Sequence, residues 1–456
     1  MTEKSVLSIL FDKGLNVDER MAWKEHVESL VHRIQDNYTH VGNSAKADIL
    51  EPKKVISDAI TIFNDGLNIG KLNFKDIADK LGIIAGWGSV IKDLANILLP
   101  GKKDPVMEKL RELGNKMDQL SNQMTKEFDA LKAFIVEHNF FADVAQTAAT
   151  LSKFMRDTVT SPCRDSYEIF KEAARKTPPL EYAYKMISLL EQDSTNPLKM
   201  AMDVEEFGGK RSTFDNWRNT IDAVITQFLL LETYINGMFW DKNMYGPNEL
   251  KNKIEKLNRN MDQWREDYKK SYWKKITPEF IKAFQIEHVK QNNEEKATIL
   301  QNELGQVLTD DAFYIMVYDH CSGYDKHSFQ YRTDQYVSSF RIEGCCVVIY
   351  RSRCWNSSDT QSKKQIEIDV ESCRNNTIGL NADHEKVPQW LRNNRIRDCH
   401  FVGLIKSDLM LSIKSANTPG YQWGPGWWIK VVKRSGYECL GSSAPELSYY
   451  LIAGFK

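Results

Sequence analysis

Apolar residues recur at steps of three and four along the first two thirds of the chain, which predicts one helix after another up to about residue 308. The longest run covers 106–136 and, at about 1.5 Å per residue, predicts a rod of roughly 45 Å. Further helices are predicted at 140–159, 165–175, 180–192, 214–240, 248–273 and 278–308. The run 214–240 is apolar nearly all round, which is typical of a helix surrounded by others. The pattern therefore predicts a bundle of long helices.

After Thr309 the period of the pattern changes from about 3.6 to two. Strands are predicted at 312–318, 336–353, 364–370, 401–415, 426–434 and 448–455, separated by Gly, Asn, Asp, Ser and Pro. Because no helix is expected between these strands, they favour an antiparallel β-sandwich or a barrel-like domain. The fold class is thus multidomain α plus β, with a helical bundle at 1–308 and a β-rich domain at 309–456.

The stretch "LGIIAGWGSVIKDLANILLPG" at 81–101 contains one lysine, one aspartate and three glycines in its first half. Drawn as a helix, 81–99 has a large apolar face, made of Ile84, Trp87, Ile91, Leu94 and Leu98 and flanked by Ile83, Val90 and Ile97. The opposite face is small and polar, with Gly82, Gly86, Ser89, Asp93 and Asn96. Such a helix either covers a bundle core or crosses a bilayer, since its length of about 28 Å is close to the hydrocarbon thickness.

The composition of the chain limits the classes of function that it can have. The 456 residues are 42% hydrophobic and 27% charged, with a net charge of −1, as in ordinary folded domains. The balanced charge argues against a nucleic-acid partner. The sequence contains no uncharged apolar run of about 18 residues, so no permanent membrane span is predicted. The N-terminal sequence does not have the pattern of a secretory leader, so none is predicted either.

The cysteines favour an extracellular location. Seven of the eight lie at or beyond Cys321, and two N-x-[ST] sequons, at Asn356 and Asn375, fall in the same region, with a third at Asn37. This clustering predicts a disulfide framework in the β-rich domain, with one cysteine of the seven free or paired to Cys163. A cytosolic location is the alternative.

No motif indicates catalysis. The sequence contains no H-E-x-x-H, C-x-x-C or G-x-S-x-G motif, and "GLNIGKL" at 66–72 is one residue short of a phosphate-binding loop. We therefore expect no enzyme activity, no metal site and no cofactor.

The segment "NTPGYQWGPGWWIKVV" at 417–432 concentrates aromatic residues around two turns: Tyr421, Trp423, Trp427 and Trp428. Exposed tryptophans on turns suit sugar stacking or contact with a lipid interface, which would make this segment a receptor-binding loop. Alternatively, Trp427 and Trp428 alternate across a strand, one of them in the core.

The blocks "IADKLGIIAGWGSVIKDLANILLPGKKDPVMEKL" and "GNKMDQLSNQMTKEFDALKAFI" resemble the N-terminal region of the box jellyfish pore-forming toxins. In that family a Gly-rich amphipathic segment ends in a Pro-Gly turn and runs into a long helix with the pattern K-x-D-x-[IL]-S. The likeness covers about residues 75–160. The architecture is also similar, more distantly, to that of the insecticidal crystal toxins. The lack of a leader differs from the family's secreted precursors.

The resemblance implies a secreted, nematocyst-stored cytolysin that binds lipid or glycan on a target cell, self-associates and inserts 81–99 into the membrane. The large apolar face named above would then contact lipid, and the small polar face would line a water-filled pore. Two other functions remain open. One is a non-lytic carbohydrate-binding or adhesion protein with a helical scaffold, and the other is an intracellular helical interaction protein.

Overall fold

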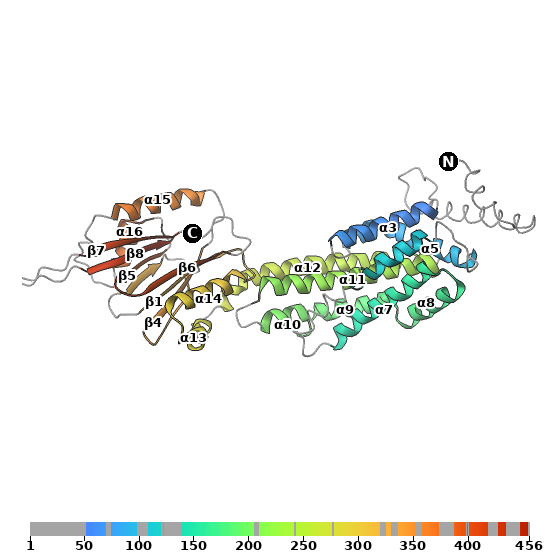
Figure 1. The fold of residues 1–456 in the computed structure, drawn as a ribbon, viewed down its shortest axis with the longest axis horizontal. Coiled ribbons are helices and arrows are strands. Elements are labelled where there is room, and N and C mark those ends of the chain that lie inside the picture. The colour runs from blue at the N-terminus through green and yellow to red at the C-terminus, as the bar shows by residue number, and fades with distance from the viewer. Residues whose placement is uncertain are drawn as a thin grey trace, which may run out of the picture. The chain divides into compact units, whose positions relative to one another are not determined.

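The computed structural model describes residues 52–69, 74–97, 108–119, 122, 139–204, 209–240, 243–275, 278–319, 325–329, 336–352, 358–373, 387–397, 399, 401–417, 427–434 and 447–454. The described residues are mostly helical up to Gly305 and form two antiparallel sheets from Ala312 onward (Figure 1). The predicted α plus β class is therefore confirmed. The chain divides into two compact units, one within Met1–Pro197 and Asn216–Arg259, the other within Leu198–Asp215 and Asn260–Lys456.

The predicted helices of the bundle are present with shifts of a few residues at their ends. These helices are α5 (Leu81–Ile97), α7 (Asn139–Thr160), α8 (Arg164–Lys176), α9 (Pro179–Glu191), α11 (Arg211–Phe239) and α12 (Tyr245–Lys275). The structure adds three helices whose bounds the pattern did not predict: α3 (Pro52–Ile69), α4 (Phe74–Asp79) and α10 (Pro197–Val204). Of the rod predicted at 106–136, residues 108–119 and 122 are helical, and the others lie outside the described residues.

Helix α11 is the centre of the first unit, as its apolar sequence predicts. Every residue from Ala223 to Met238 is buried. Two of the polar side chains among them have partners: Thr233 donates to the Leu229 carbonyl at 2.7 Å, and Gln227 donates to Ser152 Oγ at 2.5 Å. These bonds allow polar groups to lie in the core without the cost of an unpaired donor or acceptor.

Glu232 is the buried acid of this helix. It is 8% exposed, and its Oε1 accepts a hydrogen bond of 2.8 Å from Asn236 Nδ2. Within the part of the chain that the structure describes, no lysine or arginine forms an ion pair with it. Burial raises the pKa of Glu232, and hydrogen bonds from Asn236 and the Leu180 backbone only partly oppose this shift.

The prediction of one continuous helix at 278–308 is wrong. It consists of α13 (Pro278–Glu287) and α14 (Asn293–Gly305). Asn292 has extended backbone angles and caps α14, because its side chain accepts from the Glu295 backbone while Glu295 accepts from the Asn292 backbone. This reciprocal capping box ends one helix and begins the next.

The β-rich part contains two four-stranded antiparallel sheets. The first has the order β3-β4-β1-β6 and the second β2-β5-β8-β7. The strands are β1 (Ala312–Asp319), β2 (Asp325–Phe329), β3 (Tyr336–Ile342), β4 (Cys345–Ser352), β5 (Phe401–Lys406), β6 (Leu411–Asn417), β7 (Trp427–Arg434) and β8 (Leu447–Gly454). A two-residue turn joins β3 to β4, with positive φ angles of 50° at Glu343 and 78° at Gly344, as tight hairpins require.

Helices also cover the sheets, which the sequence pattern did not predict. The prediction of a strand at 364–370 is wrong, because these residues lie in α15 (Ser358–Ser372). A second helix, α16 (Val387–Asn394), follows it in the sequence. The alternating Ile366, Ile368 and Val370 imitate a strand. In the helix, Ile366 and Val370 share a face and are buried, whereas Ile368 is 60% exposed.

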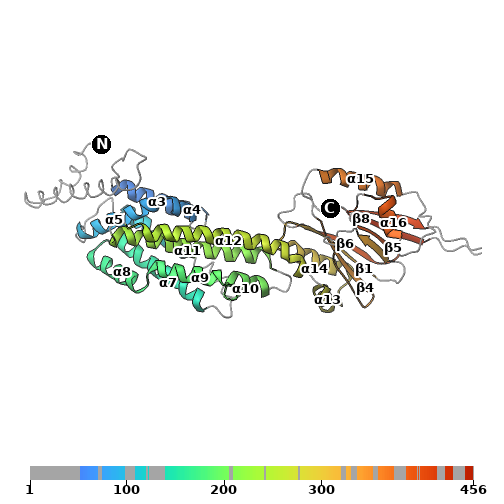
Figure 2. The ribbon, with the colours of Figure 1, turned by 180° about the vertical axis from the view of Figure 1, so that it is seen from behind.

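Three apolar clusters hold the second unit together. One joins α13 and α14 to the first sheet, a second contains side chains of both sheets, and the third joins α15 and α16 to the second sheet. Figure 2 shows these helices and strands from behind. Both faces of each sheet therefore contribute side chains to a core, which explains why β1 is apolar at nearly every position rather than at alternate ones.

Replacing Ile366 by Ala should lower the free energy of unfolding by about 2–5 kcal/mol, because it leaves a cavity in the core. The control, Ile368→Ala, should change it by less than about 0.5 kcal/mol, since its side chain is mostly in water. Urea denaturation measures both. Equal losses in the two variants would contradict the helical assignment of 358–372.

Replacing Glu232 by Gln should stabilise the chain at pH 8 but not at pH 4. Below the ordinary carboxyl pKa, Glu232 is protonated in both folded and unfolded chains. As the pH rises from there toward the raised pKa of the folded state, the folded chain binds more protons than the unfolded one. The free energy of unfolding therefore falls by at most about 1.4 kcal/mol per pH unit over this interval. Melting temperatures of parent and variant across this range test the sign, and a gain that is independent of pH would contradict it.

Candidate functional site

Helix α5 carries most of the side chains that the sequence singles out for membrane insertion. It follows α4 almost without interruption, since Ile84 N donates to the Lys80 carbonyl at 3.0 Å. Its 17 residues span about 26 Å at 1.5 Å per residue. Positions 98 and 99, which the prediction included, lie outside the described residues.

The apolar face of α5 is buried inside the bundle. Its four central side chains are at most 3% exposed: Ile84, Trp87, Val90 and Ile91. Ile83 and Leu94 are half-buried, while the side chains of Ile97 and Leu98 lie outside the described residues. Of the five large apolar groups predicted to face other helices in the folded chain, Ile84, Trp87 and Ile91 are buried.

Two glycines bring the backbones of α5 and α11 together. A Cβ atom at Gly88 would lie 2.3 Å from the carbonyl oxygen of Tyr234, and one at Gly237 would lie 1.9 Å from that of Ala85. Real Cβ atoms do not approach backbone atoms this closely, so neither position accepts a larger residue without a shift of a helix. Gly88 therefore has a packing role in the folded bundle, independent of any membrane.

Trp87 lies against Tyr234 of α11 beside this contact. The two rings are 4.7 Å apart and tilted, a favourable aromatic arrangement. The Tyr234 hydroxyl and Thr158 of α7 share a hydrogen bond of 2.9 Å, and Phe170 of α8 lies 5.9 Å from the Tyr234 ring. Burial raises the pKa of Tyr234. Helices α5, α7 and α8 thus all contact the side chain of Tyr234.

The face predicted to line a pore is only partly exposed. Gly82 is exposed, Gly86 is buried, and Ser89 and Asp93 are half-buried. The side chain of Asn96 lies outside the described residues. Among the helices that the structure describes, none is long and apolar enough to cross a membrane.

The predicted receptor-binding residues are described only in part. Tyr421 and Trp423 lie outside the described residues. Trp427 and Trp428 begin β7, where their backbones pair with Gly454 and Ala453. The recognition role of these four residues stays a prediction.

The described cysteines do not form the predicted disulfide framework. None of Cys163, Cys345, Cys346, Cys373 and Cys399 is in a disulfide. Cys163 caps α8 instead, accepting from the Ser166 backbone, and this hydrogen bond lowers the pKa of its thiol. Cys321, Cys354 and Cys439 lie outside the described residues.

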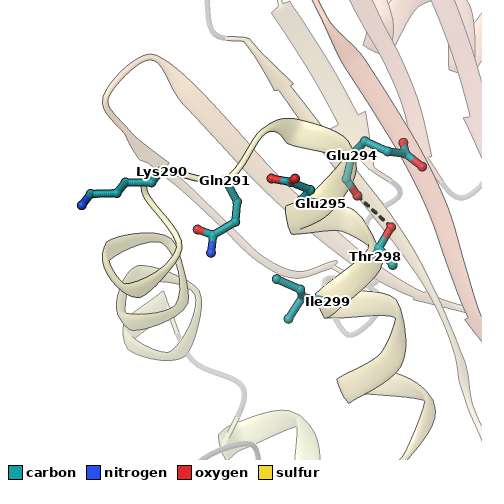
Figure 3. Close-up of a pocket in the computed structure, with 6 residues that line it drawn as sticks. All are labelled: Lys290, Gln291, Glu294, Glu295, Thr298 and Ile299. Atoms are coloured by element: carbon teal, nitrogen blue, oxygen red, sulfur yellow. Dashed lines mark hydrogen bonds between the residues drawn. The ribbon is translucent and has the colours of Figure 1, made fainter.

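An open pocket of about 560 Å³ lies between the end of α13 and the outer face of α14 (Figure 3). Its lining residues are Lys290, Gln291, Glu294, Glu295, Thr298 and Ile299. Glu294 forms contacts with Lys414 and Ser412 of β6, which lower its pKa, and Glu295 belongs to the capping box of α14. These carboxylates therefore hold α14 in place, and the pocket presents no nucleophile with a general base.

Metal ligation has no candidate in the described ranges, where no three side chains of His, Cys, Asp or Glu come together as a group that could hold an ion.

Comparison with known proteins gives one match. Residues 108–438 match the family model described as "Protein of unknown function (DUF684)", and this region is more than half of the chain. The chain belongs to the DUF684 family. No curated protein and no solved structure matches it. The DUF684 region begins at Glu108, so it excludes α5 and includes most of the β-rich part. The resemblance to box jellyfish toxins stays a prediction.

Replacing Gly88 by Ala should lower the free energy of unfolding by about 1–3 kcal/mol, because the new methyl group forces α5 away from the Tyr234 carbonyl. Gly82 is the matched control in the same helix, since a Cβ atom there meets nothing within 4 Å. Gly82→Ala should stabilise by up to about 1 kcal/mol through helix propensity. Urea denaturation separates the two, and similar effects would contradict the close contact with α11.

Proposed function

We propose that the chain is a pore-forming toxin made in a water-soluble form. It binds a target membrane, self-associates and transfers α5 from the bundle into the bilayer. The observation that carries the proposal is the buried apolar face of α5, a helix with one lysine and one aspartate in 17 residues. The resemblance of this region to the box jellyfish toxins supports it, and secretion is part of what that resemblance implies.

The energetics of α5 favour a bilayer over water as its destination. Moving a large apolar side chain such as Ile84, Trp87 or Ile91 from the core into water costs about 1.5–3 kcal/mol each. Hydrocarbon replaces the core at little net cost for these groups. Lys92 and Asp93 are costly in lipid unless they face water or a partner, so several copies would surround an aqueous lumen.

The β-rich part is proposed as the recognition domain, with its two sheets packed as a β-sandwich. Tyr314 and Tyr350 of the first sheet and Phe401 of the second support this arrangement, because they belong to one cluster. The Tyr350 and Phe401 rings stack at 4.1 Å. Tyr421, Trp423, Trp427 and Trp428 are the proposed contacts with lipid or surface glycan.

One observation favours a second candidate, an intracellular helical interaction protein. The five described cysteines form no disulfide, as is usual in a reducing compartment. This candidate predicts no effect on membranes.

Purified protein should release dye from phosphatidylcholine–phosphatidylserine–cholesterol vesicles or lyse red blood cells. Leu94→Lys should reduce release at least tenfold, because a lysine on the lipid-facing side costs about 2.5–3.5 kcal/mol in the bilayer centre. Leu94 is half-buried in the folded chain, so the lysine can reach water there.

Ser89→Lys is the control, because it adds the same charge to the face predicted to line the pore. It should keep at least half of the parent's release, and melting curves should show that both variants fold. No release and no lysis by the parent would contradict the proposed function. Equal loss in both variants would show that α5 is not the inserting helix.

A further inference from the structure

Strand β7 is the outermost strand of the second sheet, whose order is β2-β5-β8-β7 (Figure 1). All eight of its residues pair with β8, from Trp427 opposite Gly454 to Arg434 opposite Leu447. Among the described strands, none pairs with its other side. The backbone N–H and C=O groups on that side are therefore a template for a further strand.

Two apolar side chains of β7 are exposed along this edge. Ile429 is 41% exposed and Val431 is 53% exposed. They share one face of the strand, because alternate residues of a strand point the same way. Lys430 and Val432 share the other face, where Val432 is buried in the cluster that joins α15 and α16 to the sheet. The exposed pair would gain apolar contact from a partner strand.

The other three sheet edges are protected in ways that β7 is not. In β3 the register shifts between Tyr336 and Ser338, and such a bulge disrupts further pairing. On β6 the carbonyl of Ser415 accepts a hydrogen bond of 2.8 Å from Gln301 of α14. Strand β2 has only five residues and begins with an acid and a base. Strand β7 has eight residues, no proline and an unbroken register with β8.

The charge at the centre of β7 is neutralised within the chain. Lys430 forms an ion pair with Glu371 of α15. A lysine on an edge strand usually discourages pairing, because it repels the same lysine of a second copy. Here each lysine has its own carboxylate, so two copies would bring together two positive and two negative charges. This complementarity favours a second copy of the chain as the partner of this edge.

We infer that β7 is an interface at which two copies of this chain pair antiparallel and join their second sheets into one continuous sheet. The pairing is two-fold symmetric about Lys430, so Ile429 of each copy lies opposite Val431 of the other. Opposite residues of an antiparallel pair lie on the same face, so both apolar pairs form on the exposed face. The contact closes at two copies, because each chain offers one β7 edge.

The inference names a surface for the self-association in the proposed function and rests on that part of it alone. The pairing needs no membrane, so it is measured in solution and separately from dye release. A dimer without dye release would contradict the pore and leave this inference standing. Dye release by a chain that stays monomeric in solution would do the reverse.

Sedimentation equilibrium of the full chain should show a monomer–dimer equilibrium over about a hundredfold range of concentration. Val431→Lys should weaken the dimer at least about tenfold, because it removes both apolar pairs and adds two charges at the interface. Ile368→Lys is the matched control and should leave the dimer unchanged. It adds the same charge at an apolar residue that is 60% exposed on the solvent side of α15. Melting curves check that both variants fold.

Two cysteine variants test the register and need no lysine substitution. Position 429 lies opposite position 431 of the other copy, whereas each position lies diagonally from itself, at about 7–8 Å. A mixture of Ile429→Cys and Val431→Cys should therefore form a covalent dimer on mild oxidation faster than either variant alone. Non-reducing gels measure the rates, and the parent, which keeps its native cysteines, gives the background.

A parent that stays monomeric, or that forms assemblies larger than a dimer, overturns the inference. A dimer that Val431→Lys leaves unchanged overturns it as well, because the contact then lies elsewhere. If Val431→Lys does not fold, the cysteine variants decide. Cross-linking of the mixture no faster than of the single variants overturns the two-fold register and with it the inference.

Discussion

The close backbone contact between α5 and α11 determines how the first unit can pack. At Gly88 and Gly237 the two helices approach so nearly that any Cβ atom would collide with a carbonyl group. This approach places Trp87 against Tyr234, and Tyr234 in turn contacts α7 and α8. A displacement of α5 would therefore disturb three neighbouring helices at once. The side chains that make α5 a candidate for the membrane are the same ones that keep it in the bundle.

Much of the fold was predictable because most elements bury one consistent face. The predicted helices up to α12 follow the period of their apolar residues, and the strands β1, β7 and β8 coincide with apolar runs between turn residues. The failures have specific causes. Ile366, Ile368 and Val370 alternate like a strand, and only burial shows that Ile368 points to water. The break before α14 depends on the capping by Asn292, a local hydrogen-bond pattern that helical periodicity does not reveal.

The buried apolar face of α5 could be predicted from the sequence, but the glycine contact of α5 with α11 could not. Periodicity identifies Ile84, Trp87 and Ile91 as one buried face, because it needs only the geometry of a single helix. The role of Gly88 depends on what lies opposite, and no pattern within α5 shows that α11 presents Gly237 at the same crossing. The prediction of disulfides among the cysteines fails for a similar reason. Clustering in sequence does not place two thiols at bonding distance, and the described thiols instead occupy separate cores or cap a helix.

In the proposed function, α5 rather than α11 is the helix that leaves the bundle. Helix α11 is longer and equally buried, but its core-facing side chains include Gln227, Glu232 and Asn236, whose hydrogen bonds are formed within the bundle. Moving α11 into lipid would break or desolvate these bonds. Helix α5 has no comparable set among its described buried side chains apart from the indole of Trp87. In this proposal the buried polar groups would keep α11 in the bundle, whereas the apolar face of α5 would suit either the core or a bilayer.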